Sequence, residues 1–292
     1  MATPTRLVTP RDRQVFRALA HCPLTVRQLL KFSQTFDRPF TSERRLQHRL
    51  QLLRDAGRVR RFAYATAGPG APSYYTLSPD GYRIVRGEDV PPLTKRHFGP
   101  VGVAMQAHTN SLAEFIVHTA VTAHGVGVRF ANFQRENTFS LEAADEAVQP
   151  DCAFQLVRPG GVAFSFFVEL DNGTEPIRSE KDRDSWQRKL RIYEAYQQLS
   201  MTRFRLLVVS AHSGARLQRI LDLASELLRN PQRSLVYGIT LAAYLDEPDA
   251  VQAHCFRDQR GRAASLLLPP LPVVEPVSSQ RTQPLFAVPV GC

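Results

Sequence analysis

Two acidic side chains stand where apolar segments begin and end, and their types suit metal-assisted phosphate chemistry. Asp151 precedes the segment AFQLV, and Glu169 stands near the end of FSFFVEL. Charges beside a core strand are costly unless they are paired or bound to a metal ion. If the two segments pair as strands, the carboxylates come close together, and such oxygen ligands suit Mg²⁺ or Mn²⁺. An ion held there could activate water and stabilise charge on a scissile phosphate.

The spacing of these residues resembles the PD-(D/E)xK nuclease signature. Pro150-Asp151 and Glu169 match its first two elements, with the two acids at a separation of 18 residues, but Asp171 occupies the place of the signature lysine. In several branches of that superfamily the lysine comes from the following helix, so the resemblance implies Lys189, with Lys181 as a weaker candidate.

The same resemblance implies further members of the site. Such folds often supply an acidic residue from their first helix, and Glu114 is the candidate here. The catalytic residues predicted in this way are Asp151, Glu169, Lys189 and Glu114, and the predicted metal ligands are Asp151, Glu169 and the carbonyl of Leu170. The cofactor is Mg²⁺ or Mn²⁺ if the site is active, and none otherwise.

Each element of the motif also has a structural interpretation. Pro150-Asp151 could start a strand after a turn, and Asp171-Asn172-Gly173 is an ordinary tight turn. Asp171 is therefore either a ligand or part of the turn. Glu169 could pair with Lys189 without any metal ion. The sequence leaves open whether the domain is a metal-dependent DNA endonuclease or an inactive relative.

The segments around these residues predict a mixed α/β domain over residues 106–265. A helix near 108–124 precedes the strand-like runs VGVRFANF, AFQLVR and VAFSFFVEL, and a polar helix near 180–199 leads to FRLLVVS. This last run is continuously apolar, as expected of a central buried strand. The segment YGITLAAYL predicts an edge element, and the Pro-rich tail 266–292 is expected to be mostly irregular. The fold class is α/β (α+β), a mixed sandwich resembling the PD-(D/E)xK nuclease fold.

The positive charge of the chain is concentrated in its first third. The chain has 37 Lys and Arg against 27 Asp and Glu, a net charge of +10, and residues 1–97 hold 18 of the basic but only 7 of the acidic side chains. A basic module joined to a neutral one indicates a division of labour in which the first part faces a polyanion.

The basic segment predicts a winged helix-turn-helix domain over residues 1–90. Thr9 and Pro10 mark the start of one helix, Thr25 caps a second, and a third runs from Ser42 to Gly57. Two strand-like runs around the tip AGPGAPS then predict a hairpin, the wing. The Pro/Gly-rich residues 91–105 predict an inter-domain linker.

In a winged helix the third helix enters the major groove, and the wing contacts phosphates. Leu46, Leu50 and Leu53 form the apolar stripe of that helix, and the basic side chains off the stripe are expected to face solvent. The residues predicted to contact double-stranded DNA are Arg44, Arg45, His48 and Arg49 of the helix and Arg58, Arg60 and Arg61 of the wing.

Several functional classes are disfavoured by what the sequence lacks. No uncharged apolar run approaches the roughly 18 residues that span a bilayer, and the N-terminal residues contain no apolar signal segment. The four cysteines are scattered, which favours a reduced, cytoplasmic setting. Neither GxxxxGK[ST] nor GxGxxG occurs, so nucleotide hydrolysis is not expected.

The whole layout resembles the replication-relaxation family of plasmid- and mobile-element-associated bacterial proteins. The features that carry the resemblance are the winged helix, the linker, the PD dipeptide, the phrase FFVELDNGTE, and Lys189 and Tyr193 in the following helix. The resemblance implies a DNA-binding protein linked to plasmid replication or mobilisation. The alternative is a non-enzymatic transcription or copy-number regulator whose α/β domain mediates dimerisation. A homodimer and contacts with replication or mobilisation proteins are further hypotheses.

Overall fold

The computed structural model describes residues 8–65, 72–87, 93–143, 145–179, 181–182, 184–230 and 233–267. The chain divides into two compact units, residues 1–121 and 122–292. The division falls inside the long helix α5 (Gln106–Gly125), whereas the sequence analysis starts the second domain at residue 106. Helices and a large mixed sheet confirm the predicted α/β (α+β) class.

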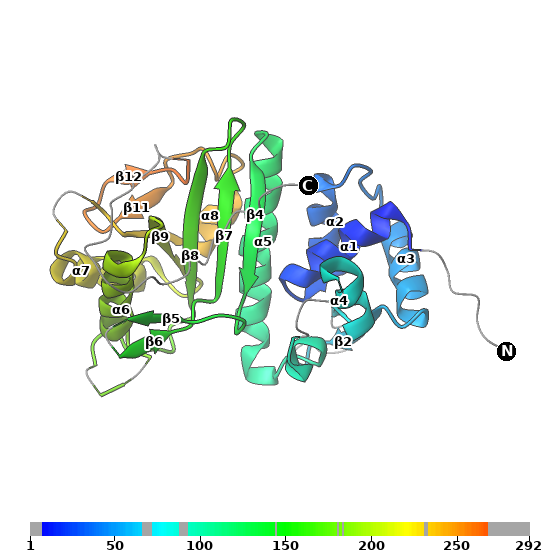
Figure 1. Ribbon diagram of the computed structural model, residues 1–292, viewed down its shortest axis with the longest axis horizontal. Coiled ribbons are helices and arrows are strands. Elements are labelled where there is room, and N and C mark those ends of the chain that lie inside the picture. Colours follow the sequence, from blue (N-terminus) through cyan, green and yellow to red (C-terminus); the bar gives the residue numbers. More distant parts are fainter. Residues whose placement is uncertain are drawn as a thin grey trace. The chain divides into compact units, whose positions relative to one another are not determined.

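The first unit begins with helices and a small antiparallel sheet (Figure 1). Its strands occur in the order β1-β3-β2. In chain order the elements are α1 (Pro10–His21), β1 (Leu24–Thr25), α2 (Val26–Phe32), α3 (Glu43–Asp55), β2 (Val59–Ala63), β3 (Ser73–Leu77) and α4 (Pro79–Arg86). A 3₁₀ turn, Ser33–Thr35, follows α2. The predicted hairpin is therefore present, although its tip, residues 66–71, lies outside the described part of the chain.

Local signals in the sequence define the ends of these helices. The hydroxyl of Thr9 accepts a hydrogen bond from the backbone N–H of Asp12, and Pro10 occupies the first helical position of α1. Ser42 caps α3 in the same way. Gly57 follows α3 with a φ of +69°, a left-handed conformation that glycine adopts without strain. The predicted leucine stripe is confirmed, because Leu46, Leu50 and Leu53 are all buried.

The segment predicted to be a linker is packed in its described part. Residues 93–105 contain two 3₁₀ turns, Lys95–Phe98 and Val103–Met105. The ring of Phe98 is buried and lies 5.7 Å from that of Tyr82, and the hydroxyl of Tyr74 accepts a hydrogen bond from the N–H of Val101 at 2.8 Å. The buried aromatic side chain thus ties the described part of the predicted linker to the first unit.

The described residues of the second unit contain a seven-stranded sheet in the order β12-β11-β10-β9-β8-β7-β4. Strands β8, β9 and β10 are parallel to one another, whereas the pairs on either side are antiparallel. The strands are β4 (Arg129–Arg135), β7 (Cys152–Val157), β8 (Ala163–Asp171), β9 (Phe204–Ser210), β10 (Val236–Thr240), β11 (Phe256–Asp258) and β12 (Ala263–Ala264). A separate hairpin, β5 (Leu141–Ala143) with β6 (Glu146–Val148), packs against α6.

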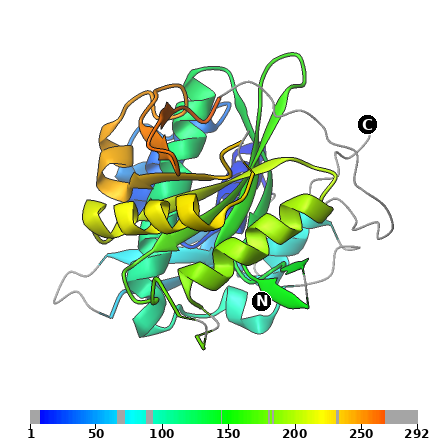
Figure 2. The same ribbon diagram turned by 90° about the vertical axis from the view of Figure 1, so that its left-hand side faces the viewer.

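Two helices connect the parallel strands and cover one face of the sheet. Helix α6 (Trp186–Leu199) links β8 to β9, and α7 (Gly214–Leu227) links β9 to β10; Figure 2 shows them side by side in front of the sheet. Their apolar side chains pack on the strands in one buried cluster that includes Phe167, Trp186, Tyr193, Leu206 and Ile220. This packing fixes the face of α6 that carries Lys189.

The remaining differences from the sequence predictions concern α6 and the elements after it. Strand β10 lies inside the sheet, between β9 and β11, rather than at its edge, and it is followed by a short helix, α8 (Leu241–Asp246). Helix α6 begins at Trp186 and not near residue 180, because Ser185 is its N-cap. Residues 268–292 of the predicted tail lie outside the described part of the chain.

Candidate functional site

Strand pairing brings Asp151 next to the end of β8. Strands β7 and β8 are antiparallel, with Cys152 opposite Val168, so the residue before β7 lies beside the last residues of β8. The N–H of Asp151 donates to the carbonyl of Val168 at 3.0 Å. The Asp151 Oδ2 atom accepts from the N–H of Leu170 at 2.6 Å. The first two elements of the predicted motif are therefore brought together.

Glu169 is buried and makes two strong hydrogen bonds. Its Oε2 accepts from Nζ of Lys189 at 2.8 Å, and its Oε1 accepts from the hydroxyl of Tyr193 at 2.6 Å. Only 2% of the residue is exposed. Burial raises the pKa of Glu169 to about 7. The charge of Lys189 opposes this rise, and the nearby Asp151 carboxylate adds to it.

Lys189 lies between two carboxylates. Besides its contact with Glu169, its Nζ donates to the two carboxylate oxygens of Glu175 at 2.7 and 2.9 Å. Burial lowers the pKa of Lys189, but the two carboxylates outweigh this effect, so the pKa lies above its ordinary value. The pKa of Glu175 is also raised, mainly by burial. The lysine is thus held as a cation between the carboxylates of Glu169 and Glu175.

Asp171, which stands at the lysine position of the motif, forms an ion pair of its own. Its carboxylate accepts from Nε and Nη2 of Arg216 in α7 at 2.8–2.9 Å, and from the indole N–H of Trp186 at 3.3 Å. The N–H of Gly173 also donates to it at 3.4 Å, a turn contact. With only 2% of the residue exposed, Asp171 joins β8 to both helices. These contacts favour the structural interpretation of Asp171.

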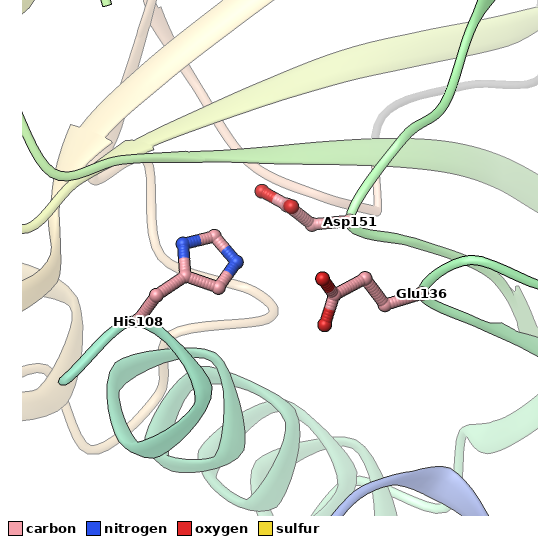
Figure 3. A group of neighbouring side chains, drawn as sticks. All are labelled: His108, Glu136 and Asp151. Atoms are coloured by element: carbon pink, nitrogen blue, oxygen red, sulfur yellow. The ribbon is translucent and has the colours of Figure 1, made fainter. Parts of the chain in front are cut away.

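A second carboxylate lies beside Asp151. In the antiparallel pair β4–β7, Arg135 is opposite Cys152, so the next residues outward, Glu136 and Asp151, face each other. Carboxylate oxygens of the two lie within 4.8 Å of each other, and Figure 3 shows both side chains pointing into the same space. Figure 3 also labels His108, which lies in the first turn of α5 in the other unit. Both acids are partly exposed.

Glu114, the fourth predicted catalytic residue, belongs to α5 in the first unit. Its Oε1 accepts from the side-chain amide of Gln28 in α2 at 2.7 Å. The same amide donates to Asn110 at 3.0 Å. These contacts tie α5 to α2, and the catalytic role of Glu114 stays a prediction.

The basic residues of α3 differ in their surroundings. Arg44, Arg45 and His48 are exposed. Arg49 is not directed freely to solvent as expected, because its guanidinium makes a two-pronged ion pair with the buried carboxylate of Asp12 in α1. Burial raises the pKa of Asp12, but the hydrogen bonds from Arg49 and Thr9 outweigh burial and lower it. Arg49 therefore holds α3 to α1. It stands next to the buried Leu50 in the sequence and is itself only partly exposed.

The wing arginines are also distinct from one another. Arg60 and Arg61 are exposed in β2, and Nη1 of Arg60 donates to the carbonyl of Phe98 at 3.2 Å. Arg58 is partly buried and lies 3.7 Å from the carboxylate of Asp80. A surface salt bridge of this kind contributes little to stability, so Arg58 can exchange its partner.

Sequence reasoning missed several residues that the fold adds to these sites. No sequence pattern pointed to Glu136, because its place beside Asp151 depends on the β4–β7 pairing. Glu175 stands in the quoted phrase FFVELDNGTE, where it was not given a role. In the first unit, a groove of about 880 Å³ beside α3 is lined partly by Arg11, Arg38, Arg45 and His48. Arg11 and Arg38 are thus further basic residues next to α3.

Comparisons with known proteins identify the family of the chain. Among the described residues, no helix combines the length and the apolar character needed to cross a membrane. Neither the curated proteins nor the solved structures yielded a match. The family model described as Replication-relaxation matches residues 18–205, a range that holds α3, Asp151, Glu169 and Lys189 and covers more than half of the chain. The chain therefore belongs to the replication-relaxation family.

Proposed function

We propose that this chain binds double-stranded DNA through its first unit, in the replication or mobilisation of a plasmid or mobile element. The observation that carries the proposal is the two-sided character of α3, whose leucines are buried while Arg44, Arg45 and His48 are exposed. The order of elements, three helices followed by an antiparallel hairpin, is that of a winged helix. Membership of the replication-relaxation family supports the biological setting.

Basic side chains near α3 and on the strand that follows it support phosphate contacts. Arg11 and Arg38 line the groove on one side, and Arg60 and Arg61 lie on β2, directly after α3. Two acidic residues also line the groove, but Asp12 is already paired with Arg49. The surface thus offers several cations to a DNA backbone, and Arg side chains suit bidentate phosphate and guanine contacts.

Fluorescence anisotropy of the full chain on labelled duplex DNA, over a series of salt concentrations, tests this proposal. Binding is expected to weaken steeply with salt, since each phosphate contact releases counterions and contributes about 0.9 to the slope of log K against log salt. Arg45→Ala should reduce affinity and slope. Arg17→Ala removes an equally exposed arginine from α1 and should change neither. Salt-insensitive binding, or equal loss in both variants, would contradict the proposal.

A second candidate function is metal-dependent cleavage of DNA by the second unit. It is favoured by the contact between Lys189 and Glu169 and by the position of Asp151 beside them. The donor atoms available are carboxylate oxygens, which fit Mg²⁺ or Mn²⁺; Asp151 and Glu169, with the Leu170 carbonyl, would hold the ion. When bound, such an ion supplies an activated water molecule and charge stabilisation at the phosphate. Lys189 would stabilise charge near the scissile phosphate.

The non-enzymatic alternative also has a specific observation in its favour. Lys189 is already neutralised by Glu169 and Glu175, and Glu169 uses both oxygens in hydrogen bonds. On this alternative the cluster is a buried structural network, and the unit serves dimerisation or partner binding in a transcription or copy-number regulator.

A cleavage assay with Mg²⁺ or Mn²⁺ on supercoiled, linear and single-stranded DNA separates the two candidates. If the unit is a nuclease, Asp151→Asn and Lys189→Met should abolish cleavage, while Glu142→Gln, which changes an exposed acid on β5, should not. Cleavage that persists in Asp151→Asn, or no cleavage by the wild type on any substrate, would favour the regulator.

A further inference from the structure

Two arginines, Arg203 and Arg233, stand just before the parallel strands β9 and β10, at the opposite end of the sheet from Glu169. Leu206 in β9 pairs with Val236 in the parallel strand β10. Arg203 and Arg233 each stand three positions before one of these partners, so they occupy equivalent places at the amino ends of adjacent strands. Glu169, in contrast, is near the carboxyl end of β8. The two arginines are therefore independent of the candidate nuclease site.

Arg233 has polar groups that are buried without a partner. Its Nε and Nη1 atoms are shielded from solvent, and no described residue forms a hydrogen bond with them. Burial, and next the charge of Arg203, lower the pKa of Arg233 to about 10. A buried guanidinium with unused donors beside a second cation is costly, and native proteins rarely keep such groups without a ligand or solvent partner.

The buried acid Asp258, which bonds to Ser234 next to Arg233, is already used by other groups. Asp258 in β11 accepts through Oδ2 from the hydroxyl of Ser234 at 2.7 Å and from Nε of Arg262 at 2.8 Å. Its Oδ1 accepts from the backbone N–H groups of Arg260 and Arg262, both at 2.9 Å. The Arg260 side chain adds a further cation nearby, because its Nη2 donates to the carbonyl of Asn230 at 2.7 Å. The immediate surroundings thus have an excess of positive charge.

We propose that Arg203 and Arg233 form a binding site for a phosphate group. The Nε–H and Nη1–H groups of Arg233 lie on different edges of the guanidinium, and each edge offers a donor to an oxygen of a tetrahedral phosphate. A dianion at this place also screens the repulsion between the two arginines. The source of the group is either free phosphate, including a nucleotide's terminal phosphate, or the phosphodiester of a nucleic-acid strand. The site does not depend on DNA binding by the first unit.

Thermal melting of the full chain in sodium phosphate, against sodium chloride of equal ionic strength, tests the site. Phosphate should raise the wild-type midpoint by roughly 2–4 °C more than chloride does, since a ligand that binds the folded state stabilises it. Arg233→Met should melt higher than the wild type in chloride, because a buried cation is removed, and should lose most of the phosphate response. Arg219→Met, which alters an exposed arginine of α7, should behave like the wild type.

Equal phosphate responses in the wild type and Arg233→Met, or no response in the wild type, would overturn the proposal. If Arg233→Met does not fold, Arg203→Met takes its place with the same expected loss. Calorimetric titration with inorganic phosphate, thymidine 5′-monophosphate and the dinucleotide TpT then separates the sources. Binding of TpT that Arg233→Met abolishes identifies an internal phosphodiester. Binding of only the first two identifies a terminal phosphate. Unchanged binding of all three by Arg233→Met contradicts the site.

Discussion

Nζ of Lys189 in α6 lies 2.8 Å from Oε2 of Glu169 in β8. A lysine of the following helix thus contacts the carboxylate of Glu169, whereas Asp171 occupies the position two residues after Glu169. Asp171 does not compete for this lysine, because Arg216 of α7 holds it. Lys189 with Glu169 and Glu175, and Arg216 with Asp171, therefore form two separate groups of ion pairs that should respond differently to mutation.

Lys189→Met is expected to destabilise the second unit by about 3–5 kcal/mol, because Glu169 is left buried beside Glu175 without a cation. Urea unfolding at neutral pH measures the loss. The double variant Lys189→Met with Glu169→Gln removes the uncompensated charge and should recover part of the stability. A double variant that is destabilised by the sum of the two single effects would show that the residues are not coupled.

Glu169 also predicts a pH dependence of stability. Its pKa is raised in the folded chain to about 7 from an ordinary value of 4.5, so the folded state binds more protons than the unfolded state between these values. The free energy of unfolding should therefore decrease as pH rises from about 4.5 to 7, and should then level off. Glu169→Gln should show a weaker decrease over this range. Parallel pH profiles for the two proteins, measured by urea unfolding, would contradict the raised pKa.

The sequence predicted the local features better than the long-range ones. Caps such as Thr9 and Ser42 and the leucine stripe of α3 depend on neighbouring residues, and they are found as expected. Lys189 was identified through a family resemblance, since no spacing rule places a helix residue against a strand. The pairing that brings Glu136 to Asp151 depends on a strand register that the sequence does not encode locally.

Arg49 shows the same limit within one helix. Periodicity assigns it to the polar side of α3, next to Arg45, and does not reveal the buried Asp12 on another helix that neutralises it. Burial of Asp12 is itself unexpected from its place in the first turn of α1, where acidic side chains usually face solvent. Partners on other elements thus decide which arginines are exposed.

Leu50→Ala is expected to reduce the free energy of unfolding by about 2–5 kcal/mol, the usual range for a leucine truncated in a packed core. Leu50 is fully buried in α3. Gln47→Ala changes an exposed position of the same helix and should cost less than about 0.5 kcal/mol. Denaturant titration compares the two. A loss well under 1 kcal/mol in Leu50→Ala would mean that this face of α3 is not the core face, and the assignment of Arg44 and Arg45 to the DNA-binding face would fail with it.

Mn²⁺ should stabilise the second unit if Asp151 and Glu169 hold a metal ion. The carboxylate of Asp151 raises the pKa of Glu169, which indicates repulsion between the two acids that a bound cation would offset. At a concentration one hundred times the dissociation constant, a ligand adds about 2.7 kcal/mol to the stability of the folded state. The melting temperature of the wild type should therefore rise with Mn²⁺ concentration and then approach a shallow logarithmic increase.

Asp151→Asn separates a metal site from a structural acidic cluster. The amide oxygen of asparagine can still accept the hydrogen bond from the N–H of Leu170, so the local fold is kept. Without the charge, the variant should melt slightly higher than the wild type in the absence of metal, and its response to Mn²⁺ should be much smaller. Glu142→Gln serves as the control and should respond like the wild type. Melting that is insensitive to Mn²⁺ in both the wild type and Asp151→Asn would leave the carboxylates as structural groups held by Lys189.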